Sequence, residues 1–372
     1  MENNIYLDNA STTCPNKEVV DLYTKIETEF FGNSGSIHKL GINSLNLLNK
    51  ARESVLESFK VKNYKVYFVG SSTEANNLAI KGYCHQYKNR GKHIITSNVE
   101  HASVKECFKT LEAEGFEVTY LNVQKDGTIK LEDLKKSIND QTILVSIMAV
   151  NNEIGSINPI SEIAKIVHQY PKANLHVDTT QSVGKIDLDY NNIDMFVLSA
   201  HKIHGLKGSG ALIAKNTLTF KPLISGGGQE NGMRSGTVSV AHACALAKAL
   251  KLELQEKNDF KKIHDYIFEK LSENNEIEIN SPKSGCNHII NFSLKNKKAS
   301  VVVEALSNKG IFVSSVSACN SKGEPASDVV RAIGKDEILS HNTIRVSLDQ
   351  HNTLDDAKIF VNSLIEILRS IK

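Results

Sequence analysis

Short β-branched runs alternate with amphipathic stretches in this chain from about residue 65 onward. Such alternation predicts βα units and a mainly parallel sheet. We expect strands at 65–69, 93–97, 117–121, 142–150, 174–178, 195–199 and 210–214, and helices at 73–89, 103–114, 131–138 and 160–168. The chain is therefore predicted to have an α/β fold.

The last third of the chain has a different pattern. After Gly226-Gly227-Gly228 we expect a helical stretch over 238–271 that connects two domains. Strands near 288–293, 311–314 and 344–348 and helices near 300–308 and 354–371 then predict a smaller α+β domain. A length of 372 residues also suits about two domains. We place a large domain at 13–257 and a small domain at 1–12 and 258–372, with a loop at about 314–328.

Composition excludes several classes of protein. With 44 Lys and Arg against 42 Asp and Glu, the chain has no basic surplus for binding nucleic-acid phosphates directly. The longest apolar runs are much shorter than a membrane span, and the first residues lack the features of a signal peptide. Six cysteines without a C-x-x-C pair indicate reduced thiols and no metal site. We therefore expect a cytoplasmic protein that does not bind membranes.

Polar side chains follow five of the predicted strands, at the ends where open α/β sheets bind ligands. Ser71 and Glu74 have the S-x-x-E spacing of a capping box, which predicts a helix N-terminus directly after the first strand. The residues at the five strand ends are Ser71-Ser72-Thr73, Glu100-His101, Asn151-Asn152, Asp178 with Gln181, and Ser199 with His201 and Lys202.

This set matches the requirements of one cofactor, pyridoxal 5′-phosphate. A lysine is needed to form a Schiff base with it, and a carboxylate keeps its pyridine nitrogen protonated, so that the ring acts as an electron sink. Lys202 and Asp178 are residues of these types, and the flat imidazole of His101 can stack on the ring. Thr73 and the helix N-terminus, with Ser199 and His201, suit a dianionic phosphate.

Each of these residues has a simpler explanation when it is taken alone. A single Lys202 is more often a solvated loop lysine, Asp178 a turn carboxylate and His101 a helix-start histidine. Their joint placement at strand ends favours the cofactor. Glycines 205, 208 and 210 precede a strand, so they do not form a dinucleotide fingerprint, and neither a P-loop nor an H-E-x-x-H motif is present.

Several sequence blocks form a combination that points to one family. The blocks are Ser199-Ala-His201-Lys202-Ile-His-Gly205, His176-Val-Asp178-Thr-Thr-Gln181, Glu100-His101, Val150-Asn-Asn152-Glu-Ile-Gly155 and Met233-Arg-Ser-Gly-Thr237. With the segments around Tyr6 and Arg345, they resemble the cysteine desulfurases, pyridoxal-phosphate enzymes of the class V aminotransferase group. The resemblance implies the fold type I architecture, with a large, mainly parallel sheet flanked by helices and a smaller α+β domain.

The resemblance also implies roles for the residues. Lys202 would form the Schiff base, Asp178 would pair with the pyridinium nitrogen, and Gln181 would hydrogen-bond the ring hydroxyl. Asn152 would lie near that hydroxyl and the substrate carboxylate, while His101 would stack on the ring and assist proton transfers. Further expected ligands are Ser72, Thr73, Ser199 and His201 for the phosphate, Thr237 for the phosphate of the partner subunit, and Arg345 with Asn33 for the carboxylate of L-cysteine.

The contribution of Thr237 to a second subunit implies a homodimer with its active site at the interface. In the same resemblance, Ser315-Val-Ser-Ala-Cys319-Asn-Ser321 corresponds to the longer type of cysteine loop. Cys319 would attack the substrate sulfur, become a persulfide and release alanine. His101 is the first candidate for taking the proton of its thiol. The sulfur would pass to an acceptor, in iron–sulfur cluster assembly or tRNA thiolation.

Two alternatives remain open at this point. The chain could be a selenocysteine lyase or another class V aminotransferase-type enzyme, in which Cys319 would be incidental. It could also be a non-catalytic binding protein with the same fold. The retention of Lys202, Asp178, His101 and Arg345 argues against the second alternative.

Overall fold

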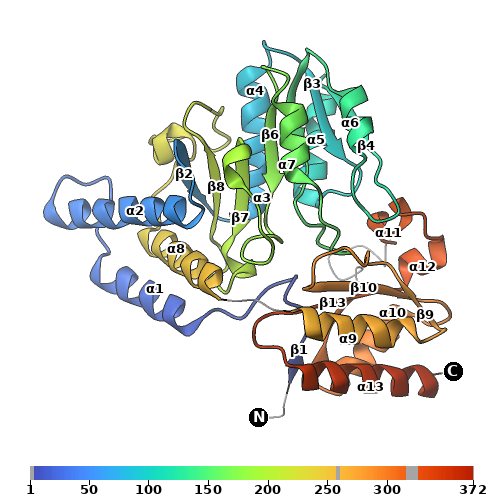
Figure 1. Cartoon of the computed structure of the whole chain (residues 1–372). Coiled ribbons are helices and arrows are strands. Elements are labelled where there is room, and N and C mark those ends of the chain that lie inside the picture. The colour runs from blue at the N-terminus through green and yellow to red at the C-terminus, as the bar shows by residue number, and fades with distance from the viewer. Residues whose placement is uncertain (1–3, 257–259, 316–325, 372) are drawn as a thin grey trace.

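A computed structural model describes residues 4–256, 260–315 and 326–371, and its larger part is built on a seven-stranded sheet (Figure 1). The strand order is β2-β8-β7-β6-β5-β3-β4. β8 runs antiparallel to β2 and β7, and the other neighbouring pairs are parallel. The strands are β2 (Tyr64–Val69), β3 (His93–Ser97), β4 (Glu117–Leu121), β5 (Thr142–Ser146), β6 (Asn174–Asp178), β7 (Met195–Ser199) and β8 (Gly210–Lys215). The prediction of a mainly parallel sheet is confirmed.

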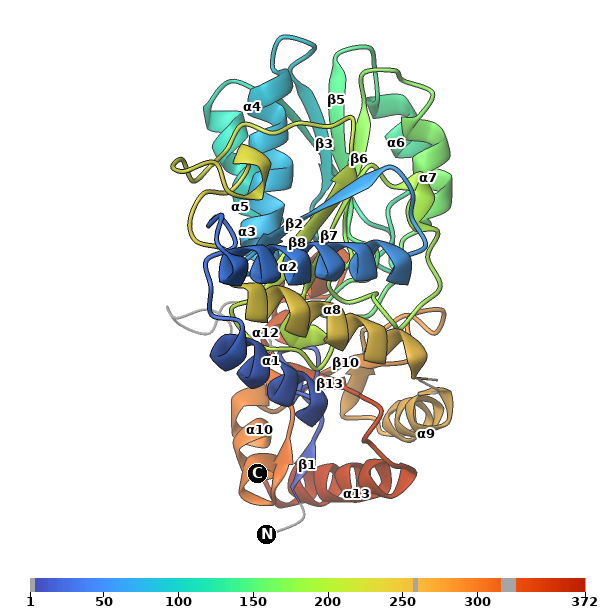
Figure 2. The ribbon, with the colours of Figure 1, turned by 90° about the vertical axis from the view of Figure 1, so that its left-hand side faces the viewer.

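Helices cover both faces of this sheet, because successive strand residues point to opposite sides and both sides are apolar. On β7, for example, Phe196 packs in one hydrophobic core and Val197 in the other. The first core includes side chains of α1 (Lys17–Glu29), α2 (Lys39–Ser58), α6 (Leu131–Ser137), α7 (Ile160–Val167) and α8 (Val240–Gln255). The second includes side chains of α3 (Ser72–Asn77), α4 (Tyr83–Tyr87) and α5 (Ala102–Ala113). Figure 2 shows α1 and α2 on either side of α8.

The rest of the chain forms a separate four-stranded antiparallel sheet in the order β12-β13-β10-β9. Its own core also contains Ile5 and Leu7 from the N-terminal segment. A short parallel pair joins β1 (Ile5–Tyr6) to β11 (Ile311–Phe312). The other elements are β9 (Ile277–Ile279), β10 (Ile289–Leu294), β12 (Ser314–Ser315), β13 (Thr343–Ser347), α9 (Lys261–Ser272), α10 (Ala299–Asn308), α11 (Asp328–Ala332), α12 (Glu337–His341) and α13 (Leu354–Ser370).

Four expected elements differ from the structure. The helix expected over 73–89 consists of α3, a π-helical segment over Leu78–Gly82 and α4. The helical stretch expected over 238–271 is two helices: α8 ends at Gln255, Glu256 is extended with ψ 138°, and α9 begins at Lys261 and packs in the other core. The strand expected over 142–150 ends at Ser146. The strand expected over 311–314 is two short strands, β11 and β12, that belong to different sheets. Among the described residues, no helix is both long enough and apolar enough to span a bilayer.

Candidate active site

A pocket of about 230 Å³ lies where the carboxyl ends of β2, β3, β5, β6 and β7 face the smaller sheet. Ala10 and Ser11 of the N-terminal segment also line it. The predicted site residues that line this pocket are Ser72, Thr73, His101, Asn152, Asp178, Gln181, His201, Lys202 and Arg345. Residues from distant parts of the sequence therefore meet in one place.

The carboxylate of Asp178 is held by donors on both oxygens. The backbone N–H of Thr180 donates to Oδ1 at 2.9 Å, and Asn76 Nδ2 donates to Oδ2 at 2.9 Å. Asn76 is fully buried on α3, and its amide also donates to Ser103 Oγ at 2.9 Å. Because hydrogen bonds to a charged group are strong, these contacts fix the direction in which Asp178 presents its charge.

The imidazole of His101 is held in one tautomer. Its Nδ1 accepts the backbone N–H of Ser103 at 3.1 Å, so the neutral ring carries its proton on Nε2. Burial lowers the pKa of His101, and the charge of Lys202 lowers it further while that of Asp178 opposes the change. Ser103 Oγ lies 2.9 Å from the same Nδ1, so Asn76 and Ser103 connect Asp178 to His101.

Lys202 ends a 3₁₀ turn that follows β7. Its Nζ donates hydrogen bonds to the carbonyl oxygens of Ala10 and, at 2.7 Å, Ser11. Gln181 Nε2 donates to the same carbonyl of Ala10 at 3.0 Å. The N-terminal segment thus brings the amine of Lys202 and the amide of Gln181 together in the pocket.

Arg345 is a buried cation that the smaller sheet contributes. It stands on β13, and its Nη1 donates to the backbone oxygen of Asn152 at 2.8 Å. Its Nη2 donates to Ser11 Oγ at 2.6 Å and to Asp8 Oδ1 at 3.1 Å. The planar guanidinium at this wall suits the recognition of a substrate carboxylate.

Hydroxyl groups gather near the start of α3. Ser71 caps this helix, and its Oγ accepts the N–H of Glu74 at 3.2 Å, next to Ser72 and Thr73 in the pocket wall. Burial and the charges of Lys202 and Lys207 lower the pKa of His201 to about 4, so its ring is neutral at physiological pH. Ser199 does not line the pocket, but its Oγ is buried without a hydrogen-bond partner among the described residues.

Two further predicted residues, Asn33 and Thr237, also lie outside this pocket within one chain. Asn33 lines a different hollow with Arg52, and its Oδ1 accepts the N–H of Gly35 at 2.9 Å. Thr237 is exposed and lines another hollow with Arg234.

The predicted nucleophile, Cys319, lies outside the described residues, as does most of the loop expected at 314–328. The described residues on either side of this segment contact the pocket wall. Ser314 is the strand partner of Arg345, and Ser327 Oγ donates to Glu153 Oε2 at 2.5 Å, one residue after Asn152.

Asn76 and Ser103 are site residues that the sequence analysis missed. Asn76 lies one helical turn after Ser72, and Ser103 follows His101 by two positions. The spacing of Ser72 and Asn76, which puts both on one face of a helix, was the available signal. Nothing in the sequence indicated that the two elements pack together at Asp178.

Comparison with known proteins agrees with this geometry. Residues 5–360 match the family model "Aminotransferase class-V". A NifS/IcsS protein homolog from Lactobacillus delbrueckii subsp. bulgaricus is 40% identical, over 98% of this chain and 97% of its own length. The cysteine desulfurase IscS of Dictyoglomus turgidum is 37% identical, over 100% of this chain and 96% of its own.

Solved structures give the same result. A NifS-like protein matches with a TM-score of 0.91 and 32% identity, covering 99% of this chain and 100% of its own. A structure titled "SspA in complex with cysteine" matches with a TM-score of 0.82 and 30% identity, covering 94% and 100%. The pocket and these full-length similarities show that the chain belongs to the cysteine desulfurases of the class V aminotransferase family.

Proposed function

We propose that this protein uses pyridoxal 5′-phosphate to remove sulfur from L-cysteine, giving L-alanine and a persulfide on Cys319. The observation that carries the proposal is the meeting of Lys202, Asp178, His101 and Arg345 in one pocket. These residues supply an amine, a fixed carboxylate, a neutral imidazole and a carboxylate-binding cation, and the family of the chain supports the same function.

The residues present fit the cofactor. Lys202 would bind it covalently, Asp178 would pair with its ring nitrogen, and Gln181 and Asn152 would contact its ring hydroxyl. Ser72, Thr73, His201 and the buried hydroxyl of Ser199 would hold its phosphate. When bound, pyridoxal phosphate supplies an electron sink that stabilises negative charge at the substrate Cα.

Substrate recognition would rest on Arg345, whose guanidinium is already oriented by Asn152, Ser11 and Asp8. Arg345 and Lys202 both contact Ser11, so a carboxylate bound at Arg345 would lie near Lys202. Asn33 would contact the same substrate carboxylate, either from the partner subunit or after a local rearrangement. The similar protein solved in complex with cysteine supports L-cysteine as the substrate.

The proton transfers fall to His101 and Lys202. Both line the pocket, and the lowered pKa of His101 leaves its ring neutral, so it can take up a proton at physiological pH. The thiolate of Cys319 attacks the sulfur of the bound cysteine. A new S–S bond forms as the C–S bond breaks, and the carbon fragment keeps the electron pair, is protonated and leaves as alanine.

Covalent geometry allows Cys319 to reach the pocket. Cys319 is four residues after Ser315, and four residues span at most about 14 Å. Ser314 pairs directly with Arg345, and antiparallel partners have Cα atoms about 5 Å apart. The segment therefore begins close enough to the substrate-binding cation for its cysteine to meet the substrate.

We also propose a homodimer. Large apolar side chains are exposed around the start of α2, including Ile37 at 94% and Phe31 at 73%. Leu40 and Ile42 of α2 extend this surface. Such a patch is typical of a subunit interface. Thr237 is exposed and Asn33 adjoins the patch, so both are available to a second copy of the chain.

The acceptor would take the persulfide sulfur in the cytoplasm, for iron–sulfur cluster assembly or tRNA thiolation. We expect the acceptor of this sulfur to be a protein. No direct contact with nucleic acid or membrane is expected from the nearly neutral net charge of +2.

Steady-state turnover with a thiol reductant tests the proposal. The cofactor-loaded protein should release sulfide and alanine from L-cysteine, and Lys202→Ala and Cys319→Ser should each abolish the release. The desulfurase assignment fails if the wild-type enzyme turns over L-selenocysteine, or transaminates another amino acid, faster than it desulfurates L-cysteine, and if Cys319→Ser leaves that faster reaction intact.

A further inference from the structure

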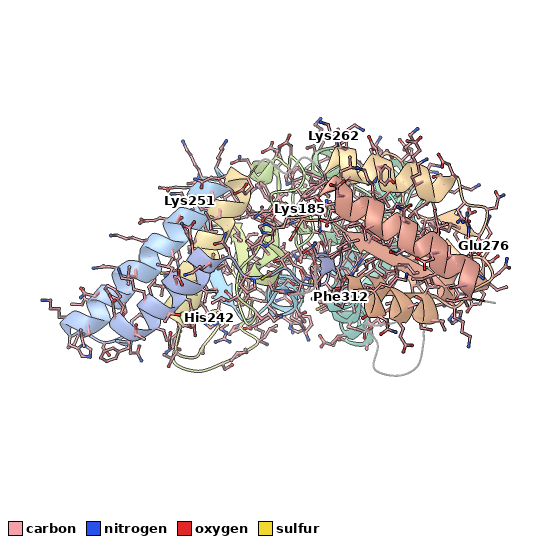
Figure 3. All side chains as sticks on the ribbon, turned by 90° about the horizontal axis from the view of Figure 1, so that it is seen from below. Lys185, His242, Lys251, Lys262, Glu276 and Phe312 are labelled. Atoms are coloured by element: carbon pink, nitrogen blue, oxygen red, sulfur yellow. The ribbon has the colours of Figure 1, made fainter. Side chains whose placement is uncertain are left out.

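A buried lysine that the proposed chemistry does not use contacts the backbone of Lys202. Lys185 Nζ donates a hydrogen bond to the main-chain carbonyl oxygen of Lys202 at 3.1 Å, and its side chain is 7% exposed. Figure 3 shows Lys185 toward the middle of the molecule, whereas Lys262 and Glu276 lie at its edges.

The charge of Lys185 is balanced by Glu253 of α8. Lys185 Nζ lies 3.1 Å from Glu253 Oε1, and the side chain of Glu253 is 2% exposed. Gly184 makes room for this contact: it has φ +73°, and a Cβ there would lie 2.4 Å from Glu253 Cγ. Removing one member of a buried ion pair leaves an uncompensated charge, which is costly.

Lys185 also joins the two turns that matter most for the pocket. It belongs to the turn after β6, which contains Gln181 and follows Asp178, the last residue of β6. The backbone N–H of Lys185 donates to the carbonyl of Ser182 at 3.0 Å. Through its side chain it reaches the turn after β7, which carries Lys202. The same contact therefore links the carboxylate and the amine of the candidate site.

The turn that carries Lys202 depends on contacts from outside. The carbonyl oxygens of His201 and His204 accept the backbone N–H groups of Thr13 and Asn16, each at 2.8 Å. His204 has φ +56°, a conformation that needs support from its surroundings. Lys185 supplies a donor for the carbonyl of Lys202, which lies between these two residues.

We propose that Lys185, supported by Glu253, is a positioning residue that sets the spacing between the amine of Lys202 and the carboxylate of Asp178. This inference rests on the proposed function, because it concerns the linkage of pyridoxal phosphate to Lys202. Lys185 does not touch the pocket itself and acts only through the backbone of Lys202.

A double variant separates positioning from stability. Lys185→Met removes only the cation of the ion pair, whereas Lys185→Met with Glu253→Gln removes both of its charges. We expect the double variant to melt within a few degrees of the wild type but to bind pyridoxal phosphate about 10-fold more weakly, since one hydrogen bond to the Lys202 turn is lost. Trapping of the cofactor on Lys202 by borohydride, followed by mass spectrometry, should fall in parallel.

Lys215→Met is the matched control, because Lys215 pairs with Asp194 at 2.7 Å at the opposite end of the same sheet. Its cofactor affinity should equal that of the wild type. If the double variant does not fold, Lys185→Arg carries the test, since it keeps the charge and changes the donor geometry, and a weaker cofactor affinity is expected.

The positioning role is overturned if the folded double variant binds pyridoxal phosphate, and traps it on Lys202, as well as the wild type does. Where Lys185→Arg carries the test, the same result in that variant overturns the role. If the wild-type protein itself shows no trapping on Lys202, the proposed function fails instead, so the two failures are distinguishable.

Discussion

Asn76 holds Asp178, the carboxylate that in our proposal pairs with the cofactor ring. Its amide donates to Asp178 and to Ser103, and Ser103 contacts His101, so one buried side chain orients both residues. Its neighbour Asn77 instead donates to the backbone oxygen of Thr73 at 3.0 Å. Two adjacent residues of the same type therefore differ in their contact with Asp178.

We predict that Asn76→Ala lowers turnover of L-cysteine about 10-fold or more, because a hydrogen bond to a charged group contributes roughly 1.5–3 kcal/mol. The visible absorbance of bound pyridoxal phosphate should shift as well. Asn77→Ala is the control and should change neither quantity. Equal losses in the two variants would show that the helix, and not the contact to Asp178, is responsible.

Glu100 predicts a pH dependence of stability. Burial raises its pKa to about 8, the charge of Asp178 adds to the rise, and hydrogen bonds from Ser97 and Met148 oppose it. A folded-state pKa above the unfolded one gives stability that is present at low pH and is lost as the pH rises toward 8.

The substituted side chain in the Glu100→Gln variant is neutral at every pH. The unfolding free energy of the variant minus that of the wild type should therefore be roughly 2 kcal/mol larger at pH 8 than at pH 6. Urea unfolding at the two pH values measures this difference. Glu304→Gln, at an exposed position of α10, controls for removal of a charge. If the difference in unfolding free energy between Glu100→Gln and the wild type is the same at pH 6 and pH 8, the role of Glu100 is contradicted.

At the scale of elements, α11 fixes one end of the segment that carries Cys319. Its N-cap residue Ser327 accepts the N–H of Val330 at 3.0 Å and donates to Glu153. Lys105 adds an ion pair to Asp328 at 2.7 Å, and Val329 and Val330 pack against Val99 and Ile154. α11 is thus attached to the loops that carry His101 and Asn152.

Ser327→Ala should lower the unfolding free energy by about 1 kcal/mol through the lost cap and should also slow persulfide formation on Cys319. Thr353→Ala removes the comparable cap of α13, none of whose described residues lines the pocket, and should lower stability alone. Rapid quenching and mass spectrometry of the Cys319 peptide compare the two. If both variants form the persulfide at the wild-type rate, the attachment of α11 does not matter for sulfur transfer.

Predictability from sequence also differs between elements. β3, β6 and β7 have the predicted bounds, because strands buried between two helical layers are apolar runs that end at polar residues. The edge strand β4 also has its predicted bounds, although most of its residues are only partly buried. The break between α8 and α9 was not predictable, since the helical pattern continues through it while the two helices enter different cores. The helices before residue 60 were not predicted at all.

The same contrast holds for the site. The residues at strand ends were identified because parallel strands bring their carboxyl ends together. Asn76 and Lys185 were missed, because their importance comes from which elements pack together. We propose that the domain boundaries fall near 12 and 257, where the chain passes from one core to the other.

At the scale of the whole molecule, the pocket needs both sheets and, in our proposal, two subunits. Mixing Lys202→Ala with Thr237→Ala subunits tests this. Mixed dimers would contain one site with an intact Lys202 and an intact Thr237, so about one quarter of wild-type activity should return after random reassortment. The absence of any recovery, with exchange of subunits verified, would contradict a shared site.

The exposed apolar patch provides a second test of the dimer. Ile37→Asp places a charge at its most exposed side chain and should yield monomers in sedimentation velocity experiments. Ile338→Asp, at an exposed residue of α12 outside the patch, is the control. A dimer that persists in Ile37→Asp would place the interface elsewhere.

In our proposal, this pocket transfers sulfur from L-cysteine to Cys319. The most direct measurement is a single exposure of the cofactor-loaded protein to L-cysteine without reductant, with alanine counted and the Cys319 peptide weighed. We predict about one alanine per active site and one added sulfur on Cys319, both abolished by Cys319→Ser. Alanine without added sulfur on Cys319, or no alanine from a protein that binds the cofactor, would contradict the account.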